Sequence, residues 1–203
     1  MTTIIFAHPW HGSFNKSILD AVIEELQNNQ QAYQVIDLNK DGFNPVMTER
    51  ELSLFAKGES LDPLVSKYQN MLKENDRLIF IFPLWWSDVP AILKGFFDKV
   101  MLKNFAYAAT SKGLKGKLTH IRTAKVIVTG QVPRWHVKYL RGNPIQKTFI
   151  GVTLKNIGIL KAKWLYCSDC SNASHTAAEK RKQFLTKIKT EIRKESGDAF
   201  QRN

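Results

Sequence analysis

Cysteine is scarce in this chain of 203 residues, with Cys167 and Cys170 as the only two. Two cysteines are too few for a disulfide framework and are consistent with a reducing compartment. Apolar runs are short, and none approaches the roughly 18 residues that a membrane-spanning helix needs. Residues 1–7 lack the basic leader and the long apolar core of a signal peptide. We therefore expect a soluble, cytoplasmic protein.

Low-complexity tracts and internal repeats are also missing from the sequence. The composition, with 43% hydrophobic and 24% charged residues, is that of an ordinary globular protein. A chain of this length is within the range that one doubly wound domain commonly fills. We expect a single domain over residues 1–203.

Acidic residues are few in the second half of the chain. Residues 1–102 contain 9 Lys and Arg against 13 Asp and Glu, a net charge of −4, whereas residues 103–203 contain 21 against 5, a net charge of +16. Such a field attracts any polyanion, including a phosphorylated dinucleotide, an anionic membrane surface or a nucleic acid, and charge alone does not choose among them. A solvated helix surface would account for much of this charge equally well.

Apolar runs alternate with amphipathic stretches along the chain. This pattern predicts strands at residues 3–7, 32–38, 77–82, 124–129 and 162–166. Helices are predicted at 13–28, at 63–73, after Pro83, near 145–157 and from Thr176 onward, with a long loop at 130–144. Asp88 is expected to cap the helix that holds Pro90 in its first turn, and Thr176 forms a capping-box pattern with Glu179.

Repeated βα units predict an α/β fold with a parallel sheet. Helices should cover both faces of this sheet, because each right-handed crossover needs a helix to return the chain. Residues 77–82 are continuously apolar, as is typical of a central strand buried on both faces. Ligands in such folds bind beyond the carboxyl ends of the strands, where the strand order reverses. The candidate site is therefore formed by the loops after Ala7, Phe82 and Thr129.

The loop after Ala7 contains neither G-x-G-x-x-G nor G-K-[ST], which disfavours a wrapped dinucleotide and a nucleoside-triphosphate P-loop. Residues 8–15 read HPWHGSFN and lead into a helix N-terminus. Unpaired N–H groups and the helix dipole suit a phosphate there. Ser13 and Asn15 would add side-chain donors, although a plain capped helix start explains both residues equally well.

The loop after Phe82 is rich in tryptophan. Residues 83–90 read PLWWSDVP, so Trp85 and Trp86 are adjacent where a central strand ends. Large aromatic side chains at this place favour a flat, apolar ring. Packing beneath a helix would explain one tryptophan, but two within a turn bounded by prolines favour a planar-ring site.

Several segments together resemble a known family. They are residues 6–15 (FAHPWHGSFN), residues 82–100 (FPLWWSDVPAILKGFFDKV), residues 105–107 (FAY) and residues 129–130 (TG). These segments resemble the NAD(P)H quinone oxidoreductases of the flavodoxin-like superfamily, which include DT-diaphorase, modulator of drug activity B and the potassium-efflux ancillary reductases. The resemblance implies a flavodoxin-like three-layer sandwich whose five-stranded parallel sheet has the order 2-1-3-4-5.

The resemblance also implies a flavin site. The flavin phosphate would be held at Ser13, Phe14 and Asn15, with His8 nearby. The residues expected to line the isoalloxazine ring are Pro83, Leu84, Trp85, Trp86 and Ser87 on one edge and Thr129, Gly130 and Gln131 on the other side.

The loop after Thr129 departs from the family pattern, because it reads TGQVPRWH where many relatives have Thr-Gly-Gly and later a tyrosine and a histidine. Those two residues steady the negative charge of the reduced flavin in relatives. His136 is our candidate for this role, with Tyr139 or Trp135 packing over the site. A solvent-exposed loop histidine is the alternative.

The activity implied by the resemblance is a two-electron, ping-pong transfer from NADPH or NADH through a flavin to a quinone. FMN is the expected flavin and FAD is possible, because the chain ends soon after its fifth βα unit, whereas longer members bind FAD with a C-terminal extension. A homodimer with the flavin near the subunit interface is implied as well. The basic residues that would favour NADPH through its 2′-phosphate are Arg122, Arg134, Lys138 and Arg141.

Two other functions stay open at this point. One is a flavin-binding electron carrier or regulatory subunit with little turnover. The other is a basic protein that binds nucleic acid or an anionic membrane, although no specific nucleic-acid motif is present in the basic half. The C-x-x-C of Cys167 and Cys170 lacks further zinc ligands and follows the last strand, so buried or idle thiols and no metal site are expected.

Overall fold

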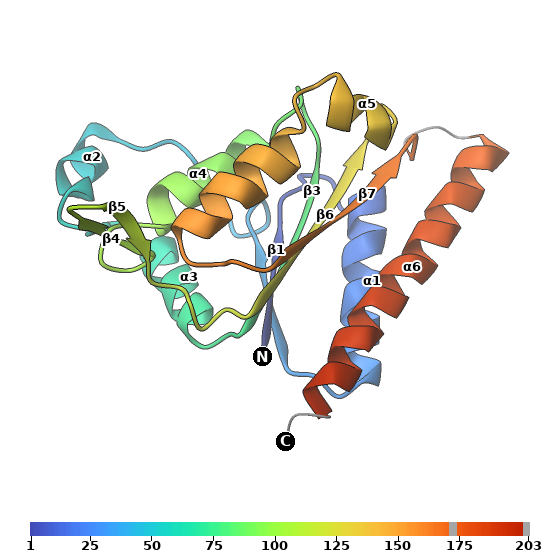
Figure 1. Ribbon diagram of the computed structural model, residues 1–203, viewed down its shortest axis with the longest axis horizontal. Helices are drawn as coiled ribbons and strands as arrows, with labels where there is room; N and C mark the ends of the chain where they lie inside the picture. Colours follow the sequence, from blue (N-terminus) through green and yellow to red (C-terminus); the bar gives the residue numbers. More distant parts are fainter. Residues whose placement is uncertain (171–173, 201–203) are drawn as a thin grey trace.

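The computed structural model describes residues 1–170 and 174–200, with side chains described through residue 194. Five parallel strands form one sheet in the order β2-β1-β3-β6-β7, which confirms the order expected from the sequence (Figure 1). The strands are β1 (Thr2–Phe6), β2 (Tyr33–Asp37), β3 (Arg77–Pro83), β6 (Thr123–Gly130) and β7 (Ala162–Ser168). The predicted three-layer α/β sandwich is therefore confirmed.

Helices cover both faces of the sheet (Figure 1). On one face α1 (Phe14–Asn28) and α6 (His175–Phe200) lie side by side. On the other face are α3 (Pro63–Lys73), α4 (Ala91–Val100) and η1 (Ile145–Leu154), a π-helix. Alternate residues of each strand point to opposite faces, so that Ile4 and Phe6 pack with α1 and α6, whereas Ile5 packs on the other side.

The central strand β3 is apolar because both of its faces are covered. Residues 78–83 of this strand are all buried, and β3 pairs with β1 on one side and β6 on the other. The register sets Phe6 beside Ile81 and Pro83 beside Thr129, so the strands end at one common edge. The loops that follow Phe6, Pro83 and Gly130 therefore meet there.

Short elements that the apolar pattern did not predict lie between the main ones. Helix α2 (Glu49–Phe55) begins with a capping box between Thr48 and Glu51. The antiparallel hairpin of β4 (Tyr107–Thr110) and β5 (Gly113–Gly116) lies at the side of the molecule (Figure 1). Helix α5 (Arg134–Tyr139) interrupts the predicted long loop at 130–144. None of these elements has the length or the apolar periodicity that sequence patterns detect.

Two predicted helix caps are wrong. Pro90 itself is the N-cap residue of α4, and the carboxylate of Asp88 accepts a hydrogen bond from the Val89 N–H within the preceding turn instead. Helix α6 begins one residue before Thr176, and Ser174 Oγ accepts from the Ala177 N–H. In both places the loop that precedes the helix, which the sequence pattern does not specify, decides where the helix begins.

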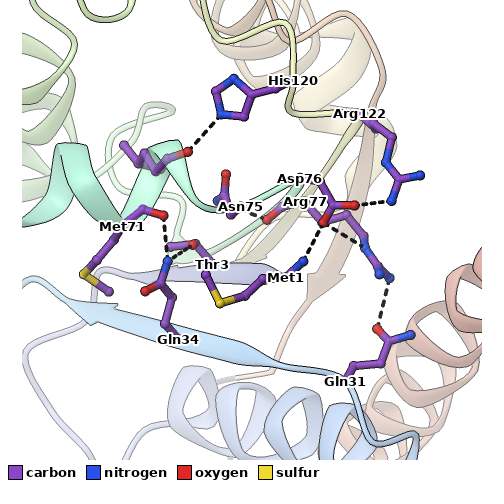
Figure 2. A network of polar contacts seen from close by, with 11 residues as sticks. Met1, Thr3, Gln31, Gln34, Met71, Asn75, Asp76, Arg77, His120 and Arg122 are labelled. Carbon is purple, nitrogen blue, oxygen red and sulfur yellow. Dashed lines mark hydrogen bonds and ion pairs between the residues drawn. The ribbon is translucent and has the colours of Figure 1, made fainter.

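A polar network joins the amino ends of the strands, at the edge opposite to the loops described above. Figure 2 shows Asp76 receiving hydrogen bonds from the Met1 ammonium, at 2.9 Å, and from the Arg122 guanidinium. Arg122 was expected to steer the phosphate of a nicotinamide cofactor, but its position at this edge, away from the loops after β1, β3 and β6, does not support that role. Among the helices of the described residues, none combines the length and apolar character that crossing a membrane requires.

Candidate active site

A cavity of about 740 Å³ opens at the carboxyl ends of β1, β3 and β6. This volume is in the range of sites for small molecules and cofactors. Loops from three strands and one side of α6 form its walls. The lining residues are His8, Trp10, Gly12, Ser13, Phe14, Asn15, Ser17, Pro83, Leu84, Trp85, Thr129, Gly130, Gln131, Cys170, Ala178, Arg181, Lys182 and Leu185.

One end of the cavity is the N-terminus of α1. Ser13 is the N-cap residue, and its hydroxyl oxygen accepts a hydrogen bond from the Lys16 N–H at 3.3 Å. The N–H groups of Phe14 and Asn15 lie in the first turn, where the helix itself offers no carbonyl partner. The helix dipole adds partial positive charge at the same place. This end of the cavity can therefore hold an anionic group.

Asn15 joins the start of α1 to the end of β6. Its amide Nδ2 donates to the Thr129 hydroxyl oxygen at 3.0 Å, and both side chains are buried. The Leu84 N–H in turn donates to the Thr129 carbonyl oxygen at 2.7 Å. Thr129, on β6, thus ties the first turn of α1 to the residue that follows β3 at the cavity floor.

The two adjacent tryptophans have different environments. Trp85 lines the cavity and is 46% exposed, whereas Trp86 is fully exposed and does not line it. The backbone explains the difference, because Trp85 and Asp88 pair with each other around a tight turn whose central residues, Trp86 and Ser87, have φ angles of 51° and 65°. Left-handed backbone is uncommon for such residues and often marks a functional site.

His8, in the loop that follows β1, lies beside Trp85 in the cavity wall, with the two ring centroids 6.1 Å apart. Burial penalises the charged ring and lowers the pKa of His8, with a smaller contribution from His11. The lowered pKa favours the neutral ring. Its Nδ1 lies 3.1 Å from both the N–H and the carbonyl oxygen of Trp10. In one tautomer Nδ1 accepts from the N–H, which leaves the Nε2 proton free to donate, and in the other Nδ1 donates to the carbonyl oxygen.

Gly130 sits where no larger residue fits. A Cβ at this position would lie 2.2 Å from the hydroxyl oxygen of Tyr166. That hydroxyl donates to the Val132 carbonyl oxygen at 2.7 Å, which fixes the start of the loop leading to Gln131 and α5. Burial, with a further contribution from Asp169, raises the pKa of Tyr166 to about 12, so it stays a hydrogen-bond donor.

Helix α6 supplies a wall that the sequence reasoning did not include. Ala178, Arg181, Lys182 and Leu185 line the cavity, and Arg181 Nη1 donates to the Cys170 carbonyl oxygen at 2.9 Å. The basic character of the C-terminal half was the only sign of this wall in the sequence, and it did not indicate a particular residue.

Cys167 and Cys170 form a disulfide, so the expectation of idle thiols is wrong.

The structure brings together ten of the predicted flavin contacts around this cavity and leaves four predicted residues outside its lining. Trp86 and Ser87 form the tip of the turn beyond Trp85. His136 and Tyr139 lie on α5, where Tyr139 is 69% exposed and His136 Nδ1 is buried with no hydrogen-bond partner in the described part of the chain. Arg134 stacks over the Trp164 ring at 4.7 Å.

This fold and the position of its cavity define the class of protein. A family model described as a flavodoxin-like fold matches residues 1–192, and the chain belongs to this family. The resemblance to NAD(P)H quinone oxidoreductases is confirmed by individual relatives. The chain is 36% identical over 105 residues to an uncharacterized NAD(P)H oxidoreductase of Escherichia coli, YcaK, covering 51% of this chain and 54% of that protein.

Further relatives and solved structures are also similar to this chain. The chain is 32% identical over 143 residues to rat NAD(P)H dehydrogenase [quinone] 1, covering 63% of this chain and 52% of that protein. It thus spans about half the length of the curated relatives it matches. An NAD(P)H:quinone oxidoreductase from Methanothermobacter marburgensis superimposes with a TM-score of 0.85 at 26% identity, over 95% of this chain and 96% of that one. Smu.1420 of Streptococcus mutans gives 0.80 at 31% identity, over 95% and 98%.

Proposed function

We propose that this protein is an NAD(P)H-dependent flavin oxidoreductase that reduces quinones or similar acceptors by two-electron, ping-pong hydride transfer. The main support for the proposal is that the cavity has a helix N-terminus at one end and an apolar, aromatic edge at the other. A flavin mononucleotide has the matching chemistry, with a phosphate on a flexible chain and a flat ring. Relatives named NAD(P)H oxidoreductase and NAD(P)H dehydrogenase [quinone] support the same function.

The phosphate end fits through its donors. Phe14 and Asn15 offer backbone N–H groups at the start of α1, and Ser13 adds its hydroxyl. Among the residues that the structure describes, no carboxylate side chain lines the cavity to repel an anion. Arg181 and Lys182 add positive charge from α6. FMN is our first choice of flavin, and FAD remains an alternative because the same basic wall could accept a second phosphate.

The ring end fits through shape and apolar surface. Pro83, Leu84 and Trp85 form one edge, and Thr129, Gly130 and Gln131 form the other side. Since Gly130 has no side chain, the backbone there can approach a ring closely. The tie between Asn15 and Thr129 holds the phosphate end and the ring end in fixed relation, which reduces the ordering cost of binding.

A bound flavin would supply the hydride and electron chemistry, and the protein would orient it and tune its charge. In the tautomer whose Nδ1 accepts the Trp10 N–H, His8 can donate a hydrogen bond from Nε2 at the cavity mouth. We keep His136 and Tyr139 as proposed charge-stabilising groups. Both are on α5, shortly after Gly130 and Gln131. The buried Nδ1 of His136, which has no hydrogen-bond partner among the described residues, supports a role for this residue.

We further propose NADPH or NADH as the electron donor and a homodimer as the working unit. Exposed apolar side chains support a protein contact close to the cavity. Trp86 is in the turn that follows β3, whereas Trp135, Tyr139 and Leu140 are on or directly after α5, which follows β6. Sedimentation velocity of the purified protein would test the dimer, because a monomer at micromolar concentration would contradict it.

The test of the proposed function is an absorption spectrum of the purified protein, with the released flavin identified by mass. The apoprotein is also incubated with FMN and with FAD, separated from free flavin and measured again. A protein that stays colourless after both incubations would remove the proposal.

Turnover separates an enzyme from an electron carrier. We expect rapid, steady NADPH or NADH oxidation when menadione is added to the flavin-loaded protein. Flavin that is bound and reduced once, without turnover, would instead favour a carrier or a regulatory subunit. Binding to DNA at physiological salt without flavin binding would favour the basic nucleic-acid protein.

A further inference from the structure

The disulfide of Cys167 and Cys170 lies between two cavities. Cys170 lines the main cavity, together with Gly130 and Arg181. Cys167 lines a second cavity of about 310 Å³, on the outer side of β7 and α6. Only 5% of each cysteine is exposed. One covalent bond thus connects the wall of the proposed flavin site to a separate surface pocket.

The turn that carries the disulfide is anchored independently of it. The Asp169 N–H donates to the Gly130 carbonyl oxygen at 3.0 Å, and Asp169 also pairs with Lys180 at 3.1 Å. Arg181 holds the Cys170 carbonyl oxygen from α6. Because these three contacts do not involve sulfur, the turn can keep its place when the disulfide opens, so that opening and closing are reversible.

The second cavity is cationic at its rim. Lys180 and Lys187 of α6 line it; Lys180 is paired with Asp169, so Lys187 supplies the positive charge in excess, and Ser168 adds a hydroxyl beside Cys167. Nearby ammonium groups favour the thiolate form of a cysteine, which is the form that attacks a disulfide. They also attract carboxylates. The pocket therefore suits a small disulfide that carries carboxylates.

We propose that Cys167 and Cys170 form a second redox centre, which takes two electrons from a flavin in the main cavity and passes them to a small anionic disulfide in the second. The inference rests on the proposed function, because NAD(P)H and the flavin supply the electrons. The sulfur–sulfur bond breaks as it gains two electrons and two protons, giving two thiols and the oxidised flavin.

The dithiol then reduces the external disulfide in two exchange steps. The Cys167 thiolate attacks one sulfur and releases the first thiol, which leaves a mixed disulfide. Cys170 then attacks Cys167 sulfur, releases the second thiol and restores the original bond. The net reaction is NAD(P)H, one proton and one disulfide giving NAD(P)⁺ and two thiols.

A thiol count tests the first step. Flavin-loaded protein is incubated with NADPH without oxygen, quenched in acid, denatured and treated with a maleimide mass tag. We expect both cysteines to carry tags when FMN and NADPH are present, and neither when FMN is omitted. Bleached flavin with untagged cysteines would overturn the inference and leave the proposed function standing. If NADPH fails to bleach bound flavin, the proposed function fails. The disulfide inference is then tested by reducing the bound flavin with light and EDTA and counting thiols in the same way. Failure to bind any flavin overturns both.

Two matched substrates test the second step. Dithiodiglycolate is a small dianionic disulfide, and cystamine is a dication of similar size. We expect dithiodiglycolate to be reduced about tenfold faster, as for other electrostatically steered ligands. Cys167→Ser should abolish this reaction while menadione reduction continues, since Cys167 does not line the main cavity. Equal rates for both disulfides would overturn the anionic assignment, and undiminished disulfide reduction by a flavin-loaded Cys167→Ser protein would overturn the relay.

Discussion

The side chains of Asn15 and Thr129 are hydrogen-bonded at 3.0 Å although 114 positions separate them in the chain. The bond joins the first turn of α1 to the last residues of β6, at the floor of the cavity. Each side chain offers the other both a donor and an acceptor. Because the pair is buried, removing one partner leaves the other without a hydrogen bond, which costs free energy of folding.

Thr129→Val is therefore expected to lower the free energy of unfolding by about 1–3 kcal/mol, because the near-isosteric change leaves the buried amide of Asn15 without its partner. Flavin affinity should fall as well, since the two ends of the cavity lose their tie. Urea denaturation and flavin titration measure the two effects. Thr190→Val, at an exposed position of α6, is the control and should change stability by less than about 0.5 kcal/mol. Equal stability of the two variants would contradict the role given to this bond.

Trp85 and Trp86 provide a matched test of the ring site. Trp85→Ala should weaken flavin binding by roughly tenfold or more, because a base or flavin ring stacked on an aromatic side chain gains about 1–3 kcal/mol. Trp86→Ala removes the same indole from a fully exposed position outside the cavity lining and should weaken flavin binding less than Trp85→Ala does. Fluorescence quenching of FMN gives both dissociation constants. A larger loss for Trp86→Ala than for Trp85→Ala would contradict the assignment.

The apolar pattern predicted the five strands of the sheet because burial leaves a direct trace there, whereas the strand order followed from the family resemblance. Residues 78–82 are continuously apolar since both faces of β3 are covered. The same reasoning located the loops after β1, β3 and β6, because parallel strands end at one edge. Most of the lining from these loops was therefore predictable.

Other features depend on geometry that composition does not record. The divergent environments of Trp85 and Trp86 follow from left-handed φ angles at Trp86 and Ser87, in residues that rarely adopt them. The wall formed by Arg181 and Leu185 depends on the docking of α6 against α1, which a single helix pattern does not reveal. The Cys167–Cys170 bond likewise depends on a local turn with Asp169 at a φ of 55°.

Tyr166→Phe should have opposite effects on stability in the wild-type protein and in the Gly130→Ala variant. Gly130→Ala is expected to cost about 1–3 kcal/mol, because the new methyl group would lie 2.2 Å from the Tyr166 hydroxyl oxygen. Tyr166→Phe alone should also destabilise, since it removes the donor to the Val132 carbonyl oxygen. In the Gly130→Ala background, however, Tyr166→Phe should restore part of the lost stability by removing the closest clash. Additive destabilisation in the double variant, measured by thermal unfolding, would rule this out.

Asp76 makes the stability of the fold depend on pH at the edge of the sheet opposite to the cavity (Figure 2). Burial would raise the pKa of this carboxyl, but hydrogen bonds from the Met1 ammonium and Arg122 outweigh burial and lower the pKa from 3.8 to about 2. Because the folded value is below the unfolded one, the carboxylate stabilises the folded protein at pH values above 4. This contribution is lost as pH falls from about 4 to about 2.

Asp76→Asn should therefore destabilise the protein by about 2 kcal/mol at pH 7, where the wild-type carboxylate is fully charged in both states. The difference from the wild type should shrink below pH 4 and close near pH 2, because protonation then removes the same charge from the wild type. Asp98→Asn is the control, since Asp98 pairs with Lys94 on the exposed surface of α4 and such pairs contribute about 0–1 kcal/mol. Urea denaturation of the three proteins between pH 2 and pH 7 provides the comparison. A gap between Asp76→Asn and wild type that stays constant over this range would mean that the network does not act through the charge of Asp76.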